Sequence, residues 1–116
     1  MKTNRKGFTL VEIMIVVAII ALLAAIAIPS FMKSRTEARK SACINNLRLI
    51  DHAKQQYATA DTSVTETTDC DVAPGKAAVE SYLKGGAPTC PSSGTYTYGI
   101  VSNNPVCSFA GHVLSR

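Results

Sequence analysis

The sequence predicts an α+β protein: a long N-terminal helix with an apolar first half and a kink near Pro29, followed by a small head. Three observations predict it. Residues 13–28 are apolar without interruption, residues 31–60 contain neither glycine nor proline, and Thr, Ser, Asp, Gly and Pro become frequent from residue 61. We therefore expect four parts, at residues 1–7, 8–30, 31–60 and 61–116.

Length and charge narrow the possible functions. A chain of 116 residues has room for one small domain beside the apolar segment, which argues against a large catalytic core. Its formal net charge is +4, but three of the basic residues are Lys2, Arg5 and Lys6. Without residues 1–7, nine basic and eight acidic residues leave a charge of about +1. The charge therefore does not indicate a nucleic-acid partner.

The apolar segment has the length of a membrane helix. At about 1.5 Å per residue, residues 8–28 span about 30 Å, which is the thickness of the hydrocarbon core of a bilayer. A secretory signal peptide is the alternative, because Ala25-Ile26-Ala27 would suit a signal peptidase that cuts before Ile28. Glu12 is unexpected in either case. A carboxylate at full membrane depth costs about 2.5–3.5 kcal/mol, so Glu12 needs a partner or must reach the interface.

The residues around Glu12 carry a family resemblance. The run Lys6-Gly7-Phe8-Thr9-Leu10-Val11-Glu12, with the apolar stretch and Pro29 after it, resembles the N-terminal cleavage and methylation motif of type IV prepilins. The same motif marks the pseudopilins of type II secretion and competence systems. The resemblance covers about residues 5–35. It implies a structural protein rather than an enzyme.

The resemblance also implies a processing route. A prepilin peptidase would cut between Gly7 and Phe8 and methylate the new Phe8 amine. The Glu12 carboxylate would then meet a Phe8 ammonium, in its own chain or in a neighbouring subunit, as the apolar helices bundle into a filament. The implied partners are other pilin subunits, the peptidase, an inner-membrane assembly platform and the lipid bilayer. The precursor would cross the bacterial inner membrane once before it joins a periplasmic or cell-surface filament.

Two other functions are weighed against this one. A monomeric, membrane-anchored or secreted ectodomain with a binding role would need neither the Gly7-Phe8 junction nor Glu12. A DNA-uptake surface would use Tyr96 and Tyr98 for stacking, together with nearby basic residues. The head offers only Lys76, Lys84 and Arg116. We therefore expect no nucleic-acid partner.

Beyond Pro29 the sequence predicts that the helix continues to about residue 60. Proline removes one N–H group and kinks or ends a helix, and the good helix formers that follow favour a kink. Five apolar residues recur at spacings of three and four: Cys43, Leu47, Ile50, Ala53 and Tyr57. The basic residues Lys33, Arg35, Arg39 and Lys40 form either a solvated face or a contact for anionic lipid or acidic neighbours.

The sequence of the head, residues 61–116, predicts a short helix and a β-hairpin. Residues 77–84 form the helix, with Gly85 as its cap. Residues 95–101 alternate with Tyr96, Tyr98 and Ile100 on one face, and residues 106–110 form the second strand after a turn. Because two strands alone are marginally stable, we expect the hairpin to lie across the apolar stripe of the helix.

The four cysteines include no C-x-x-C pair, which favours disulfides in an exported domain over zinc or redox chemistry. Cys90 with Cys107 is the most local pairing and leaves Cys43 with Cys70, although the sequence leaves all three connectivities open. His52 and His112 have no ligand partners at metal-binding spacing and are expected to be surface or packing residues. Asp69 and Asp71 are expected to be structural loop carboxylates; a calcium site is the alternative, because some pseudopilin heads bind calcium, but the EF-hand spacing of acidic residues is absent. No metal or cofactor is expected.

Overall fold

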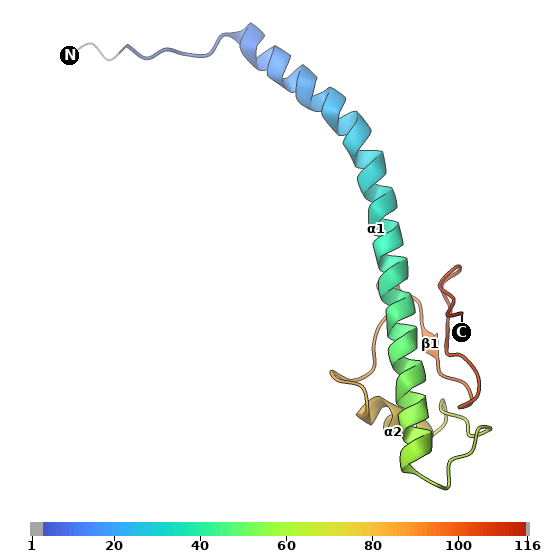
Figure 1. The fold of residues 1–116 in the computed structure, drawn as a ribbon. Coiled ribbons are helices and arrows are strands. Elements are labelled where there is room, and N and C mark those ends of the chain that lie inside the picture. The colour runs from blue at the N-terminus through green and yellow to red at the C-terminus, as the bar shows by residue number, and fades with distance from the viewer. Residues whose placement is uncertain (1–3, 116) are drawn as a thin grey trace. The chain divides into compact units, whose positions relative to one another are not determined.

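The structure is a computed structural model that describes residues 4–115, so residues 1–3 of the predicted leader and Arg116 lie outside the described residues. Its elements are the helices α1 (Leu10–Ala60) and α2 (Gly75–Ser81) and the strands β1 (Tyr96–Thr97) and β2 (Val106–Cys107) (Figure 1). The predicted α+β class is confirmed. The chain divides into two compact units, with the boundary between Arg35 and Thr36.

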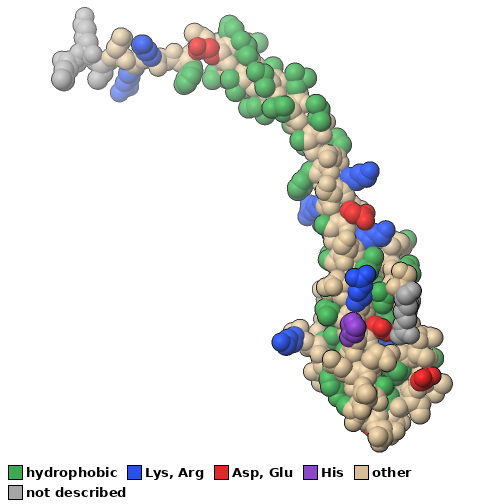
Figure 2. Space-filling view, viewed as in Figure 1, with side chains coloured by type: hydrophobic (Ala, Val, Ile, Leu, Met, Phe, Trp, Pro, Cys, Tyr) green, Lys and Arg blue, Asp and Glu red, His purple; other side chains and the backbone are tan. Residues whose placement is uncertain are grey.

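The N-terminal unit consists of the apolar part of α1 and the residues before it. The helix begins at Leu10, two residues later than predicted, and runs through Pro29 without interruption. Pro29 therefore does not end the helix; the kink there stays a prediction. Every large apolar side chain from Phe8 to Met32 is exposed, and apolar side chains cover this half of α1 in Figure 2. This unit has no core of its own.

The head is built on the second half of α1. All five residues of the predicted apolar stripe are buried, which confirms the prediction. Ile50, Ala53 and Tyr57 pack in one core cluster with Cys70, Val79, Tyr98 and Val101. The hairpin region therefore does lie on the stripe. Lys54 is buried beside these residues, which the sequence analysis did not anticipate.

The short helix and the hairpin differ from their predicted bounds. Helix α2 begins two residues earlier than expected and ends at Ser81, so Gly85 lies beyond it, at a positive φ of 93°. The strands pair antiparallel over two residues each, with Cys107 opposite Tyr96 and Val106 opposite Thr97. The paired strands are therefore much shorter than the predicted ranges, residues 95–101 and 106–110.

Asp71 explains why the hairpin is so short. Its two carboxylate oxygens accept hydrogen bonds from the backbone N–H groups of Tyr98, at 2.9 Å, and Gly99, at 2.7 Å. Gly99 also has a positive φ of 66°, which an extended strand does not allow. Backbone donors that would continue the ladder are thus turned toward the loop that contains Asp71. The interpretation of Asp69 and Asp71 as structural carboxylates agrees with this contact.

Candidate functional site

The predicted cleavage junction lies in an exposed segment outside the helix. Residues 4–9 have no regular secondary structure, and Phe8 is 84% exposed. A Cβ atom built on Gly7 would have no neighbouring atom within 4 Å. Exposed, non-helical backbone is the form in which peptidases bind a chain. The Gly7-Phe8 bond therefore lies in a segment that a peptidase can reach without first unwinding the helix.

Directly after the junction, Thr9 and Glu12 cap the helix. The backbone N–H of Thr9 donates to Glu12 Oε2 at 2.8 Å, and the N–H of Glu12 donates to Thr9 Oγ1 at 3.3 Å. This reciprocal pair is a capping box, which satisfies two N–H groups at the start of a helix. It places the Glu12 carboxylate at the backbone N–H of Thr9, the residue that directly follows Phe8.

The sequence analysis missed the capping box although its signal is visible. The motif is a Ser or Thr followed three residues later by Glu or Gln, before an apolar run, and Thr9-Leu10-Val11-Glu12 fits it. For Glu12 the sequence analysis considered only the membrane interface or a Phe8 ammonium, in the same chain or in a neighbouring subunit, and not the Thr9 backbone. Thr9 is therefore an additional residue of this site.

The apolar part of α1 is long and apolar enough to cross a membrane. Signal sequences and the core helices of soluble proteins can have the same length and composition. A core helix would be covered by its own protein, whereas these side chains are uncovered. A helix that is apolar on all sides is stable only when lipid or other protein surrounds it. Its surroundings must therefore come from outside the chain.

The cysteines do not form the predicted pairs in the structure. All four are free thiols, and Cys70 lies in the core cluster described above. Cys43 instead lies with Cys90 and Cys107, and the fourth member of the group is His112. His112 is only 4% exposed, and its Nδ1 lies 3.7 Å from Cys90 Sγ. The prediction that His112 has no cysteine partner was therefore wrong, whereas His52 is exposed as expected.

The pKa values of Cys43 and Cys90 are shifted in opposite directions. Burial raises the pKa of Cys43 to about 12, although the Tyr96 hydroxyl donates a hydrogen bond to its sulfur at 3.4 Å. Burial also acts on Cys90, but hydrogen bonds from the backbone N–H groups of Ser92 and Gly94 and contacts with Cys43 and His112 lower its pKa to about 6. Hydrogen bonds to a thiolate favour the charged form, so the pKa of Cys90 lies well below that of Cys43.

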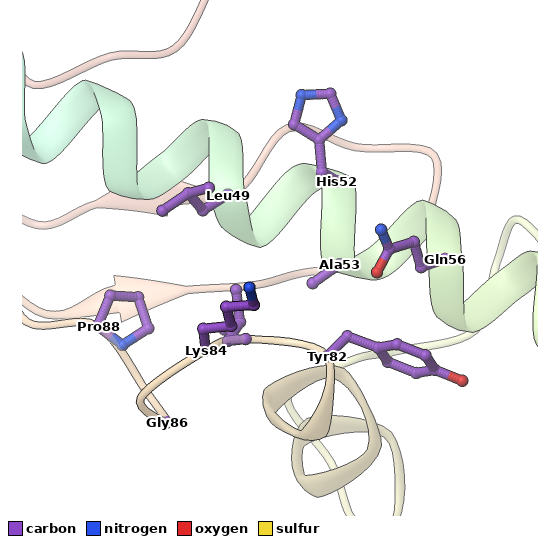
Figure 3. A pocket seen from close by; sticks show the side chains of 9 residues that line it. Leu49, His52, Ala53, Gln56, Tyr82, Lys84, Gly86 and Pro88 are labelled. Atoms are coloured by element: carbon purple, nitrogen blue, oxygen red, sulfur yellow. The ribbon is translucent and has the colours of Figure 1, made fainter.

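The head also has a pocket of about 290 Å³ between α1 and the segment that follows α2. Figure 3 shows Leu49, Ala53 and Pro88 among its lining residues, with the His52 ring turned away from Lys84. The lining is mostly apolar and includes neither a carboxylate nor a thiol. Its polar lining residues are His52, Gln56, Tyr82 and Lys84.

Comparison with known proteins places these features in context. Residues 2–28 match the family model of the prokaryotic N-terminal methylation motif. The type IV wide pilus major component PilA4 of Thermus thermophilus is 33% identical over 109 residues, which cover 94% of this chain and 75% of that protein. No solved structure gives a significant match.

Two further relatives match over shorter stretches. The type IV major pilin protein PilA of Myxococcus xanthus is 48% identical over 47% of this chain, and the type II secretion system core protein G of Vibrio cholerae is 35% identical over 60% of it. These matches span 24% and 48% of the two relatives. Relatives are thus found among both pilus and secretion proteins.

Proposed function

This chain belongs to the type IV pilin-like family, and on that premise we propose that it is a structural subunit, pilin or pseudopilin, of a type IV pilus or type II secretion filament. One observation carries the proposal: the exposed, apolar first half of α1 begins directly after an accessible Gly7-Phe8 junction, and the Glu12 carboxylate caps its start. A helix that served only as an anchor would need lipid around it but no acidic residue near its start.

Processing prepares the subunit for assembly. Prepilin peptidase cuts after Gly7 in the bacterial inner membrane and methylates the Phe8 amine, while the head lies on the other side of the membrane. Cleavage creates an ammonium next to the segment that Glu12 caps. The apolar helix remains whole because the cut lies before its first residue, Leu10. The precursor is therefore held by lipid, and the mature subunit by lipid or by other subunits.

Glu12 then directs the addition of subunits. When apolar helices bundle, an unpaired carboxylate would lie in a dry environment, which is unfavourable by several kcal/mol. Pairing with a Phe8 ammonium offsets most of this cost. In the capping box only one of the two carboxylate oxygens of Glu12, Oε2, accepts a hydrogen bond. The other oxygen can therefore pair with the ammonium of a neighbouring subunit. Misaligned addition would leave both charges unpaired, so the pair selects the register of assembly.

Replacing each of two acidic residues of α1 with alanine tests this role. Glu12→Ala should leave processing and membrane insertion intact but reduce the protein in the sheared filament fraction at least tenfold, because subunits lose the pair that favours register. Glu37→Ala is the matched control, since Glu37 is an exposed acid on the same helix, outside the motif. Immunoblots of the sheared and membrane fractions measure both.

Equal amounts of the Glu12→Ala and Glu37→Ala proteins in sheared filaments would contradict the role of Glu12. A wild-type protein that stays wholly in the membrane fraction, in cells with an active assembly system, would instead favour the anchored-ectodomain alternative.

A further inference from the structure

Four side chains from four separate segments meet in the head. Cys43 comes from α1, Cys90 from the segment between α2 and β1, Cys107 from β2, and His112 from the segment after β2. Their three sulfur atoms and one imidazole nitrogen all lie within 4.8 Å of one another. Such convergence of soft ligand atoms is not required by packing alone, because any apolar side chains could fill the space.

We propose that Cys43, Cys90, Cys107 and His112 bind one zinc ion in a closed, tetrahedral site. Three thiolates and one imidazole are an established ligand set for structural zinc. With Zn–S bonds of about 2.3 Å, the sulfur atoms of a regular tetrahedron are about 3.8 Å apart. The 3.7 Å between Cys90 Sγ and His112 Nδ1 already matches that spacing. The other ligand atoms need to move inward by about 1 Å at most.

The residues around the cluster favour thiolates. Each sulfur receives a hydrogen bond: Cys43 from the Tyr96 hydroxyl, Cys90 from backbone N–H groups, and Cys107 from the Phe109 N–H at 3.4 Å. Donors of this kind orient metal-bound sulfur and stabilise its charge. Asn46 holds the Tyr96 hydroxyl in turn, at 3.2 Å. Zinc binding releases the remaining thiol protons to solvent.

Gly94 lies directly beside the sulfur atoms of this cluster. A Cβ atom at this position would lie 2.6 Å from Cys107 Sγ, which is closer than real contacts allow, and 3.3 Å from Cys90 Sγ, which is a tight contact. Only glycine lets the backbone pass this near to both sulfur atoms. The loop after Cys90 therefore wraps around the ligand atoms, and its N–H groups face Cys90.

A disulfide explains the cluster less completely than a metal ion. A bond between Cys90 and Cys107 would use two of the three sulfur atoms and would leave Cys43 and His112 without a function. A metal ion engages all four groups at once. Cys70, which the disulfide scheme assigns to Cys43, lies in the core cluster instead. All four ligand positions are filled by protein, so this site has a structural role and does not activate water.

The site would hold together a head whose sheet has only two strands of two residues each. Zinc would connect α1 to the segments around Cys90, Cys107 and His112, which the structure otherwise joins through few hydrogen bonds. Small domains commonly need a disulfide or a metal for this purpose. This inference does not depend on filament assembly.

Metal analysis of the full-length protein tests the proposal. The chain is purified in detergent, reduced and without chelators, and its zinc is measured by elemental mass spectrometry. We expect about one zinc ion per chain, with X-ray absorption showing three sulfur atoms at about 2.3 Å and one nitrogen at about 2.0 Å. Cobalt exchanged into the wild-type site should give a thiolate-to-cobalt charge-transfer band, a readout that requires no variant.

Matched variants assign the ligands. Cys107→Ala and His112→Ala should lose the zinc, whereas Cys70→Ala and His52→Ala should retain it, because Cys70 and His52 lie outside the cluster. Two results would overturn the proposal. One is a reduced wild-type protein that binds neither zinc nor cobalt. The other is a Cys90–Cys107 disulfide, detected by peptide mass mapping, in protein isolated from its native host.

Discussion

At the scale of single residues, the proposed function gives Glu12 one task before processing and another after it. In the full chain its carboxylate accepts the Thr9 N–H and closes the start of α1. After cleavage the Phe8 ammonium lies within one residue of the same cap. A positive charge at a helix N-terminus opposes the helix dipole, and Glu12 counters it. In the proposed function the same carboxylate serves both helix initiation and subunit pairing, and these two tasks explain why an acid is tolerated beside an apolar run.

Thr9→Val tests the cap without changing the shape of the side chain. Loss of the hydroxyl acceptor should weaken the first turn by about 1 kcal/mol, because the Glu12 N–H loses its partner. Amide exchange at Glu12, measured by NMR in micelles, should be about fivefold faster. Ser41→Ala, a change on the exposed side of the same helix, is the control. Unchanged exchange at Glu12 would show that the capping box does not stabilise this end.

Residue-level prediction from sequence succeeded where the interaction is local and failed where it depends on the fold. Gly7, Phe8 and Glu12 could be identified because their motif lies within a few positions. The four-residue group around His112 could not be assembled, since Cys43 and Cys90 come from segments far from His112 in the sequence. Lys54 gave no signal either, because a lysine beside an apolar stripe usually reaches solvent.

At the scale of elements, Lys54 holds the hairpin region on α1. Its Nζ donates to the Tyr98 carbonyl at 2.5 Å and to the Asn103 carbonyl at 2.6 Å, and the side chain is 0% exposed. These carbonyls lie in the connection between β1 and β2. Since the sheet is short, this buried ammonium replaces ladder hydrogen bonds that a longer hairpin would supply. A polar side chain from a helix thus fixes the position of a weak sheet.

Lys54→Met should loosen this connection. The methionine keeps the apolar stem but leaves two carbonyls without their donor, at a cost of about 3 kcal/mol. Exchange of the Cys70 and Val101 amides, which hydrogen-bond to Gly99 and Thr68, should accelerate about 100-fold. Lys84→Met is the control, because Lys84 is exposed. Equal protection in the two variants would contradict the role of Lys54.

Element boundaries were predictable to different degrees. The end of α1 and its buried stripe followed from helical periodicity, which a single helix preserves in any context. The hairpin was predicted too long because alternation continues through Ile100, whereas Asp71 captures the N–H groups of Tyr98 and Gly99. Asp71 comes from a distant loop. Its effect on the strand was therefore not visible in the local pattern.

At the scale of the whole molecule, the chain joins two units with opposite requirements. The head buries its own core, and the N-terminal unit leaves its apolar surface uncovered. The apolar surface of the N-terminal unit is therefore buried only when lipid or other subunits surround the helix. The function of the N-terminal unit could be predicted from sequence because it depends on composition and a compact motif. The metal-binding proposal for the head required the fold, since its four ligands come from separate segments.

The most direct test of the filament-subunit proposal is the intact mass of the native protein, taken from sheared filaments and from membranes. We predict a chain that begins at Phe8 and carries one methyl group on its amine, with Glu12 and the whole of α1 retained. A chain that begins at Ile28 would show that the apolar segment is a signal peptide, and a chain that keeps residues 1–7 would show that it is only an anchor. Either of these results would contradict the proposed function.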